Sequence, residues 1–98
     1  MGYNKSYEDL VVWQKSIDLA ENVYSITKKF PNGELYGLTS QLQRSAISIA
    51  SNIAEGCVRN SAKDFLRFIS IAIGSAAELK TQFIIANRIG YVDEKIII

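Results

Sequence analysis

Residues 61–90 read SAKDFLRFISIAIGSAAELKTQFIIANRIG, and this stretch decides the fold class. Ser61 with Asp64 three residues later is a helix-capping pattern, and Gly90 is a typical helix stop. The stretch therefore predicts a helix over residues 62–89. Apolar side chains between these ends recur at steps of three and four, which is the spacing of one helix face. They are Phe65, Ile69, Ala72, Ala76, Leu79, Phe83 and Ala86.

The opposite side of this predicted helix is also apolar, because Leu66, Ile73, Ala77 and Ile84 form a second stripe. A helix that is apolar nearly all round is expected to be buried nearly all round. About 28 residues make a helix of roughly 42 Å, which is longer than a small monomer covers easily. The sequence therefore predicts that the chain is homo-oligomeric.

Two more helices are predicted upstream, at about 8–29 and 38–55. Ser6 is the expected cap of the first helix, and Gly56 is the expected stop of the second. Asp93 resembles the cap of a fourth helix that begins at 93. The short connections imply antiparallel neighbours, so we expect an all-α, up-down helical bundle that forms a single domain over residues 1–98.

Composition excludes most classes of enzyme. The chain has 98 residues, a formal net charge of +1 and no histidine, which is the commonest general base and transition-metal ligand. Cys57 is the only cysteine, and its position after a helix end gives it no activation by the helix dipole. No uninterrupted run of eighteen apolar residues is present. We expect a cytoplasmic protein without catalytic residues, metal, cofactor or membrane contact.

Several segments resemble one known family, the small four-helix-bundle proteins encoded by intervening sequences in bacterial 23S ribosomal RNA genes. The most distinctive segment is SIASNIAEG at residues 48–56. The resemblance covers about residues 7–92. The other matching segments are YEDLVVWQK at 7–15, LTSQLQRSA at 38–46, FLRFISIA at 65–72 and GSAAEL at 74–79.

This resemblance implies an up-down four-helix bundle that assembles as a homopentamer. It implies no established biochemical activity. A related branch contains the accessory proteins of diversity-generating retroelements, which bind reverse transcriptase and RNA. The family's fourth helix would need about twenty residues after Tyr91, whereas this sequence ends at Ile98. A missing fourth helix, a truncation or a frameshift would each account for that difference.

Polar side chains form a stripe along each of the two later helices, and antiparallel packing would bring the stripes together. We expect Arg44 to lie level with Gly74 and within reach of Glu78, and Glu55 to reach Arg67. Asn52 belongs to the same stripe. The set of Arg44, Asn52, Glu55 and Glu78 is interpreted as an inter-helix polar network that sets register. A groove for a ligand or nucleic acid is the alternative.

Arg59, Lys63 and Arg67 follow at steps of four and are the candidate contacts to nucleic acid or to a partner. In a ring of subunits this basic edge would be repeated, which would strengthen weak phosphate contacts. We therefore expect a non-enzymatic, homo-oligomeric protein associated with RNA or a ribonucleoprotein. A protein-interaction scaffold or accessory subunit without nucleic-acid contact is the alternative.

Overall fold

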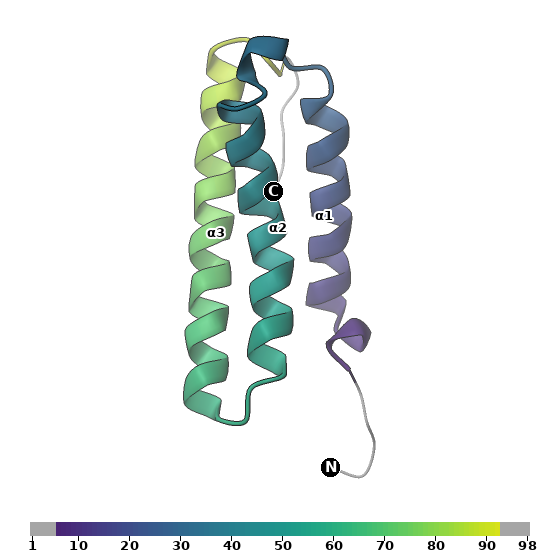
Figure 1. Cartoon of the computed structure of the whole chain (residues 1–98), viewed down its shortest axis with the longest axis vertical. Helices are drawn as coiled ribbons and strands as arrows, with labels where there is room; N and C mark the ends of the chain where they lie inside the picture. Colours follow the sequence, from purple (N-terminus) through teal and green to yellow (C-terminus); the bar gives the residue numbers. More distant parts are fainter. Residues whose placement is uncertain (1–5, 93–98) are drawn as a thin grey trace.

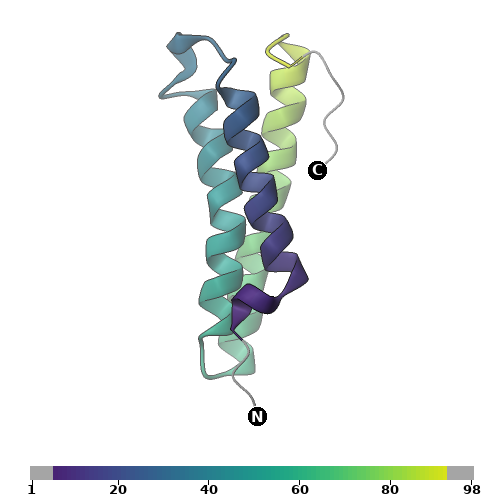
Figure 2. The same cartoon turned by 90° about the vertical axis from the view of Figure 1, so that its right-hand side faces the viewer.

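The computed structural model describes residues 6–92, and in this part of the chain it is all-α, without strands. Three α-helices run up, down and up as α1 (Val11–Thr27), α2 (Leu38–Cys57) and α3 (Ala62–Arg88). Two 3-10 turns, η1 (Tyr7–Asp9) and η2 (Asn32–Glu34), precede α1 and α2. The molecule is a rod of 50 × 22 × 21 Å (Figures 1 and 2). The all-α, antiparallel prediction is confirmed. The expected helix start at 93 lies outside the described residues.

The first helix is shorter than the predicted 8–29. Ser6 does act as a cap, but its hydroxyl accepts the Glu8 N–H at 3.0 Å and therefore caps the 3-10 turn η1. Leu10 then takes an extended conformation, with φ −78° and ψ 128°, so α1 begins only at Val11. At the other end, the Lys29 and Phe30 N–H groups bond to carbonyls three residues back. The chain thus tightens out of the α-helix before Pro31.

The second helix continues past its predicted stop at residue 55. Gly56 is helical and buried, and α2 ends one residue later, at Cys57. A Cβ atom at position 56 would lie 3.1 Å from the Phe68 Cβ and 3.2 Å from the Phe65 carbonyl oxygen. Gly56 is therefore a point of close approach between α2 and α3, rather than a helix terminator.

Both ends of α3 follow the prediction to within one residue. The Ser61 hydroxyl accepts the Asp64 N–H at 3.1 Å. At the far end Gly90 has φ +87°, in the left-handed region that favours glycine. The Tyr91 N–H bonds to the Ala86 carbonyl at 2.9 Å, and the Gly90 N–H bonds to the Asn87 carbonyl at 3.1 Å. This pair of bonds is a Schellman motif, which ends the helix and turns the chain back.

The core lies where α2 faces α3 and α1, and α2 is central, as expected from its small side chains. No Cα atom of α1 comes within 8 Å of one in α3. The predicted α2 stripe of Leu42, Ala46, Ile49 and Ile53 is buried throughout. The rest of the buried apolar cluster consists of Val23, Phe30, Ala72, Leu79, Phe83, Ala86 and Val92.

Glu34 ties the connection between α1 and α2 to the chain that leaves α3. One carboxylate oxygen accepts the Tyr91 hydroxyl at 2.8 Å, and the other accepts the Leu38 N–H at 3.1 Å. These two donors, the Tyr91 hydroxyl first, hold the pKa of Glu34 below its usual value. The same bond, together with partial burial and the nearby carboxylate charge, raises the pKa of Tyr91.

The first prediction concerns the two glycines within helices. We expect Gly56→Ala to lower the free energy of unfolding by about 1–2 kcal/mol, because the Phe65 backbone cannot rotate away from the new methyl group. Gly74 lies in α3, and no atom comes within 4 Å of the place that an added methyl group would take there. Gly74→Ala is the matched control and should raise stability by about 0.5–1 kcal/mol. Urea unfolding followed by circular dichroism measures both, and equal effects would contradict the close approach.

The second prediction concerns pH. A carboxyl whose pKa is lowered on folding stabilises the fold above its unfolded pKa, and this stabilisation is lost as pH falls through the folded pKa. Glu34 should therefore make the unfolding free energy fall as pH drops below 4.5. Tyr91→Phe keeps the ring against Phe30, at 5.3 Å between centroids, and removes the hydroxyl bond. This variant should show a weaker acid dependence.

At alkaline pH the unfolding free energy changes in the opposite direction, because it falls as pH rises. Because the pKa of Tyr91 is raised, its contribution is fully present below pH 10.0 and is lost as pH rises through the folded pKa. Tyr24→Phe is the control, since Tyr24 is exposed on α1. If Tyr91→Phe and Tyr24→Phe give the same pH profile of unfolding, the tie through Glu34 is wrong.

Candidate functional site

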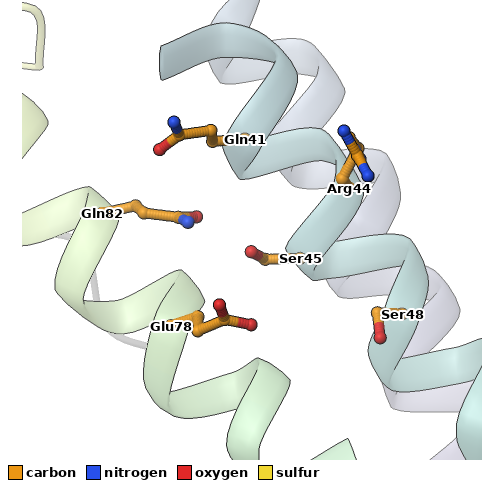
Figure 3. Close-up of a pocket in the computed structure, with 6 residues that line it drawn as sticks. All are labelled: Gln41, Arg44, Ser45, Ser48, Glu78 and Gln82. Carbon is orange, nitrogen blue, oxygen red and sulfur yellow. The ribbon is translucent and has the colours of Figure 1, made fainter. Parts of the chain in front are cut away.

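A polar groove follows the seam between α2 and α3 and has a volume of about 470 Å³. Gln82 and Glu78 extend from α3 toward α2, while Gln41 and Ser45 extend from α2 toward α3 (Figure 3). Arg44 and Ser48 complete the lining. Every lining side chain is polar. Two residues of the predicted network, Arg44 and Glu78, therefore share one groove.

A chain of side-chain hydrogen bonds links α2 and α3 at Ser48, which lines the groove. The Ser48 and Ser75 hydroxyls lie 2.7 Å apart across the two helices. The Asn52 amide donates to the Ser48 hydroxyl at 3.0 Å and to the Ser48 carbonyl at 2.8 Å. The structure thus places Asn52 in an inter-helix polar link. Ser75, which is 5% exposed, was missed by the sequence analysis, although a serine within the buried stripe of its helix needs a hydrogen-bond partner.

The register between the two helices differs from the expected one. Ser48 meets Ser75, whereas the predicted register would have placed it near Ile69. Part of the difference arises because α2 continues through Gly56 to Cys57, which shortens the turn before α3. Arg44 lines the same groove as Glu78, whereas Gly74 is not among its lining residues. A Cβ atom added at Gly74 would have no neighbour within 4 Å.

Glu55 does not reach Arg67 as expected. Its carboxylate pairs with Arg59 one turn further on, at 2.6 Å. Arg67 instead lies 3.9 Å from Asp64 within α3. Arg44 and Glu78 form no ion pair with each other, and neither has an oppositely charged partner within 4.0 Å in residues 6–92. Glu78 and Arg44 are therefore the unpaired charges of the groove.

The predicted basic edge is built on an aromatic ring at the turn between α2 and α3. The guanidinium carbons of Arg59 and Arg67 lie 4.8 and 4.4 Å from the centre of the Phe68 ring. Such stacking holds both guanidinium groups in place through the ring face, and the N–H groups that Glu55 and Asp64 do not engage remain able to donate. Lys63 is exposed on the first turn of α3. The structure thus brings Arg59 and Arg67 together, through Phe68, which the sequence analysis had not singled out.

Within residues 6–92 no three His, Cys, Asp or Glu side chains gather closely enough to hold a metal ion. Cys57 is a free, half-buried thiol. It lines an apolar hollow with Tyr7, Leu10 and Val58 at the end of the rod where α2 meets α3. This placement agrees with a packing role for the thiol.

Comparison with models of protein families shows which family the chain matches. The family model described as 23S rRNA-intervening sequence protein matches residues 8–98. The match extends over all three helices and agrees with the resemblance found in the sequence. A search of curated proteins finds no similar sequence.

Proposed function

Because the chain belongs to the 23S rRNA-intervening sequence protein family, we propose that it is a non-enzymatic, homo-oligomeric bundle protein that associates with RNA or a ribonucleoprotein. The observation that carries this proposal is the pair of guanidinium groups held over Phe68. Each group keeps a substantial exposed surface, with 42% of the Arg59 side chain and 59% of the Arg67 side chain accessible. Exposed, oriented guanidinium groups suit phosphate oxygens.

The proposed RNA contact is weak for a single chain. Glu55 and Asp64 lie beside Arg59 and Arg67 and offset two of the three positive charges at this end. Several such ends in one assembly would act together, since linked sites bind a long polyanion far more tightly than one site does. The RNA proposal therefore depends on the oligomer.

Self-association is supported by the outer face of α3. Leu66 is 62% exposed and Ile73 is 66% exposed, although the sequence predicts a helix buried on nearly all sides. Val11 and Val12 on α1 are also exposed, at 62% and 58%. Exposed apolar faces of this extent are typical of protein interaction sites. We propose the homopentamer that the family resemblance implies.

A fourth helix is supported by the space between α1 and α3. An apolar groove of about 390 Å³ runs there, with Val12 and Leu19 on one wall, Ala76 and Ala77 on the other, and Ile49 of α2 at its base. Because no Cα atom of α1 lies within 8 Å of one in α3, the groove between them is wide enough to support the proposal of a fourth helix in an up-down bundle. We propose that a helix following α3 fills it.

A cytoplasmic location without membrane contact is part of the same proposal. By length and composition alone, α3 is a helix that could cross a membrane. However, Glu78 and Lys80 lie in the middle of its apolar stretch, and Glu78 lines the polar groove. A lysine at the centre of a bilayer costs about 2.5–3.5 kcal/mol. An α3 covered by other protein surfaces is therefore the better account.

The alternative proposal is a scaffold or accessory subunit that contacts only protein. The groove between α1 and α3 favours it, because Lys15 and Lys80 flank the apolar lining. An amphipathic partner helix with acidic edges would fit this combination. Salt separates the two proposals, since RNA binding weakens steeply with ionic strength and apolar docking does not.

The third prediction tests RNA binding with fluorescence anisotropy of a labelled, mixed-sequence single-stranded RNA. Arg59→Glu with Lys63→Glu should lower the affinity at least about tenfold and reduce the salt slope by about 0.7 for each lost phosphate contact. Lys28→Glu with Lys29→Glu makes the same change of charge at the end of α1, which lies at the other end of the rod from the turn between α2 and α3 (Figure 1), and should have a small effect. Equal affinity of both double variants would reject an RNA contact at the basic edge.

The fourth prediction tests self-association by light scattering after size exclusion. The unmodified chain should have the mass of a pentamer. Ile73→Asp should shift the protein to smaller species, because a charge in an apolar interface is costly to bury. Asn60→Asp, at an exposed position of the turn between α2 and α3 and away from the apolar faces, is the control. A monomeric unmodified chain would rule out the proposed assembly.

A further inference from the structure

The polar groove between α2 and α3 contains hydrogen-bond acceptors that the described chain does not satisfy. The Gln82 Oε1 atom is buried and accepts no hydrogen bond. Glu78, one turn earlier on α3, has no cation within 4.0 Å in residues 6–92. Both side chains extend into the groove (Figure 3). Since buried polar atoms in proteins nearly always have partners, the Gln82 oxygen points to a donor that comes from outside the chain. The Glu78 carboxylate beside it is exposed and therefore open to a cation.

The chemistry of the groove restricts that donor. The Glu78 carboxylate favours a positive charge, and the neighbouring Gln82 oxygen requires a second N–H in nearly the same direction. A guanidinium group supplies several N–H donors in one rigid plane and carries the charge, whereas an ammonium is a compact point charge. The lining contains no aromatic side chain, so a nucleobase would find no ring to stack on.

Arg44 adds a second requirement. It lines the same groove and has no carboxylate within 4.0 Å in the described chain. A carboxylate is the partner that a guanidinium pairs with best, through two parallel hydrogen bonds. The groove can thus hold a positively charged group of a ligand beside Glu78 and a negatively charged group beside Arg44. Its volume of about 470 Å³ falls within the range of about 300–1,000 Å³ that is usual for small-molecule sites.

We propose that this groove binds a free amino acid of the arginine class. The guanidinium of the ligand lies against the Glu78 carboxylate and the Gln82 oxygen, and its carboxylate lies against Arg44. Gln41 and the Ser45 hydroxyl supply further polar contacts to the ligand. The Ser48–Ser75 bond links the two helices beside the groove and keeps its two walls in register.

The test is isothermal titration calorimetry of the full chain with arginine, agmatine and citrulline. Agmatine keeps the guanidinium but lacks the carboxylate, and citrulline has nearly the same shape but lacks the positive charge. Arginine should bind, agmatine should bind about tenfold more weakly, and citrulline should bind at least about tenfold more weakly. GMP carries a planar N–H edge together with a phosphate and should not bind.

Three variants separate the parts of the site. Glu78→Gln should weaken arginine binding at least about tenfold, because it removes the charge and keeps the shape. Arg44→Gln should weaken binding of arginine but leave agmatine unchanged. Glu21→Gln, at an exposed position of α1, is the matched control and should change nothing. Circular dichroism of each variant separates loss of binding from loss of fold.

Several results would overturn the proposal. One is the absence of any heat of binding at about 20 mM arginine, a concentration well above the dissociation constant of about 1 mM of a weak ligand. That result would mean that only water occupies the groove. Equal binding of citrulline and arginine, or undiminished binding of arginine to Glu78→Gln, would show that the guanidinium of the ligand does not bind at Glu78. Equal binding of agmatine and arginine would show that the ligand carboxylate does not contact Arg44. Binding of GMP in place of arginine would make the site a nucleotide site.

Discussion

The rest of the structure depends on the close approach of α2 and α3 at Gly56. A Cβ atom at this position would lie 3.1 Å from the Phe68 Cβ and 3.2 Å from the Phe65 carbonyl oxygen, so glycine suits this close approach. Further along the seam, Ala46, Ala72 and the Ser48–Ser75 pair keep the helices close. Small side chains allow this closeness, and the hydrogen bond between the serines fixes how far one helix slides along the other.

Both candidate sites follow from this contact. With α2 extended through Gly56, the turn brings Arg59 over Phe68, where it meets Arg67. The same register sets Arg44 opposite Glu78, with Gln82 one turn further along α3. A basic edge lies at one end of the seam and a groove with unpaired charges lies nearer the other. Neither arrangement is local to one helix, so neither would survive a different sliding position of the pair.

The packing of α1 is less complete than the packing of α2 against α3. Because α1 comes close to α2 but not to α3, its wide apolar arc is covered only in part, and Val23, Thr27 and Phe30 are buried while Tyr24 is exposed. The apolar surface of α3 is also covered only in part: Leu79, in one of its two apolar stripes, is fully buried, and Ile73, in the other, is largely exposed. In the three-helix arrangement, α1 and α3 therefore each bury only part of their apolar surface. The uncovered sides are the physical reason to propose both a fourth helix and an assembly of chains.

The sequence by itself determined the helices, their order and most of the buried set, because apolar spacing, the Ser61 cap and the Gly90 stop act within a few residues of themselves. It also determined the family, through segments such as SIASNIAEG at 48–56. Only the tertiary structure decided the role of Gly56, the pairing of Glu55 with Arg59, and the meeting of Ser48 with Ser75. A glycine can stop a helix or admit a neighbour, and a charged residue has several partners within one turn. The choice between them depends on how the helices pack, which residue spacing does not encode.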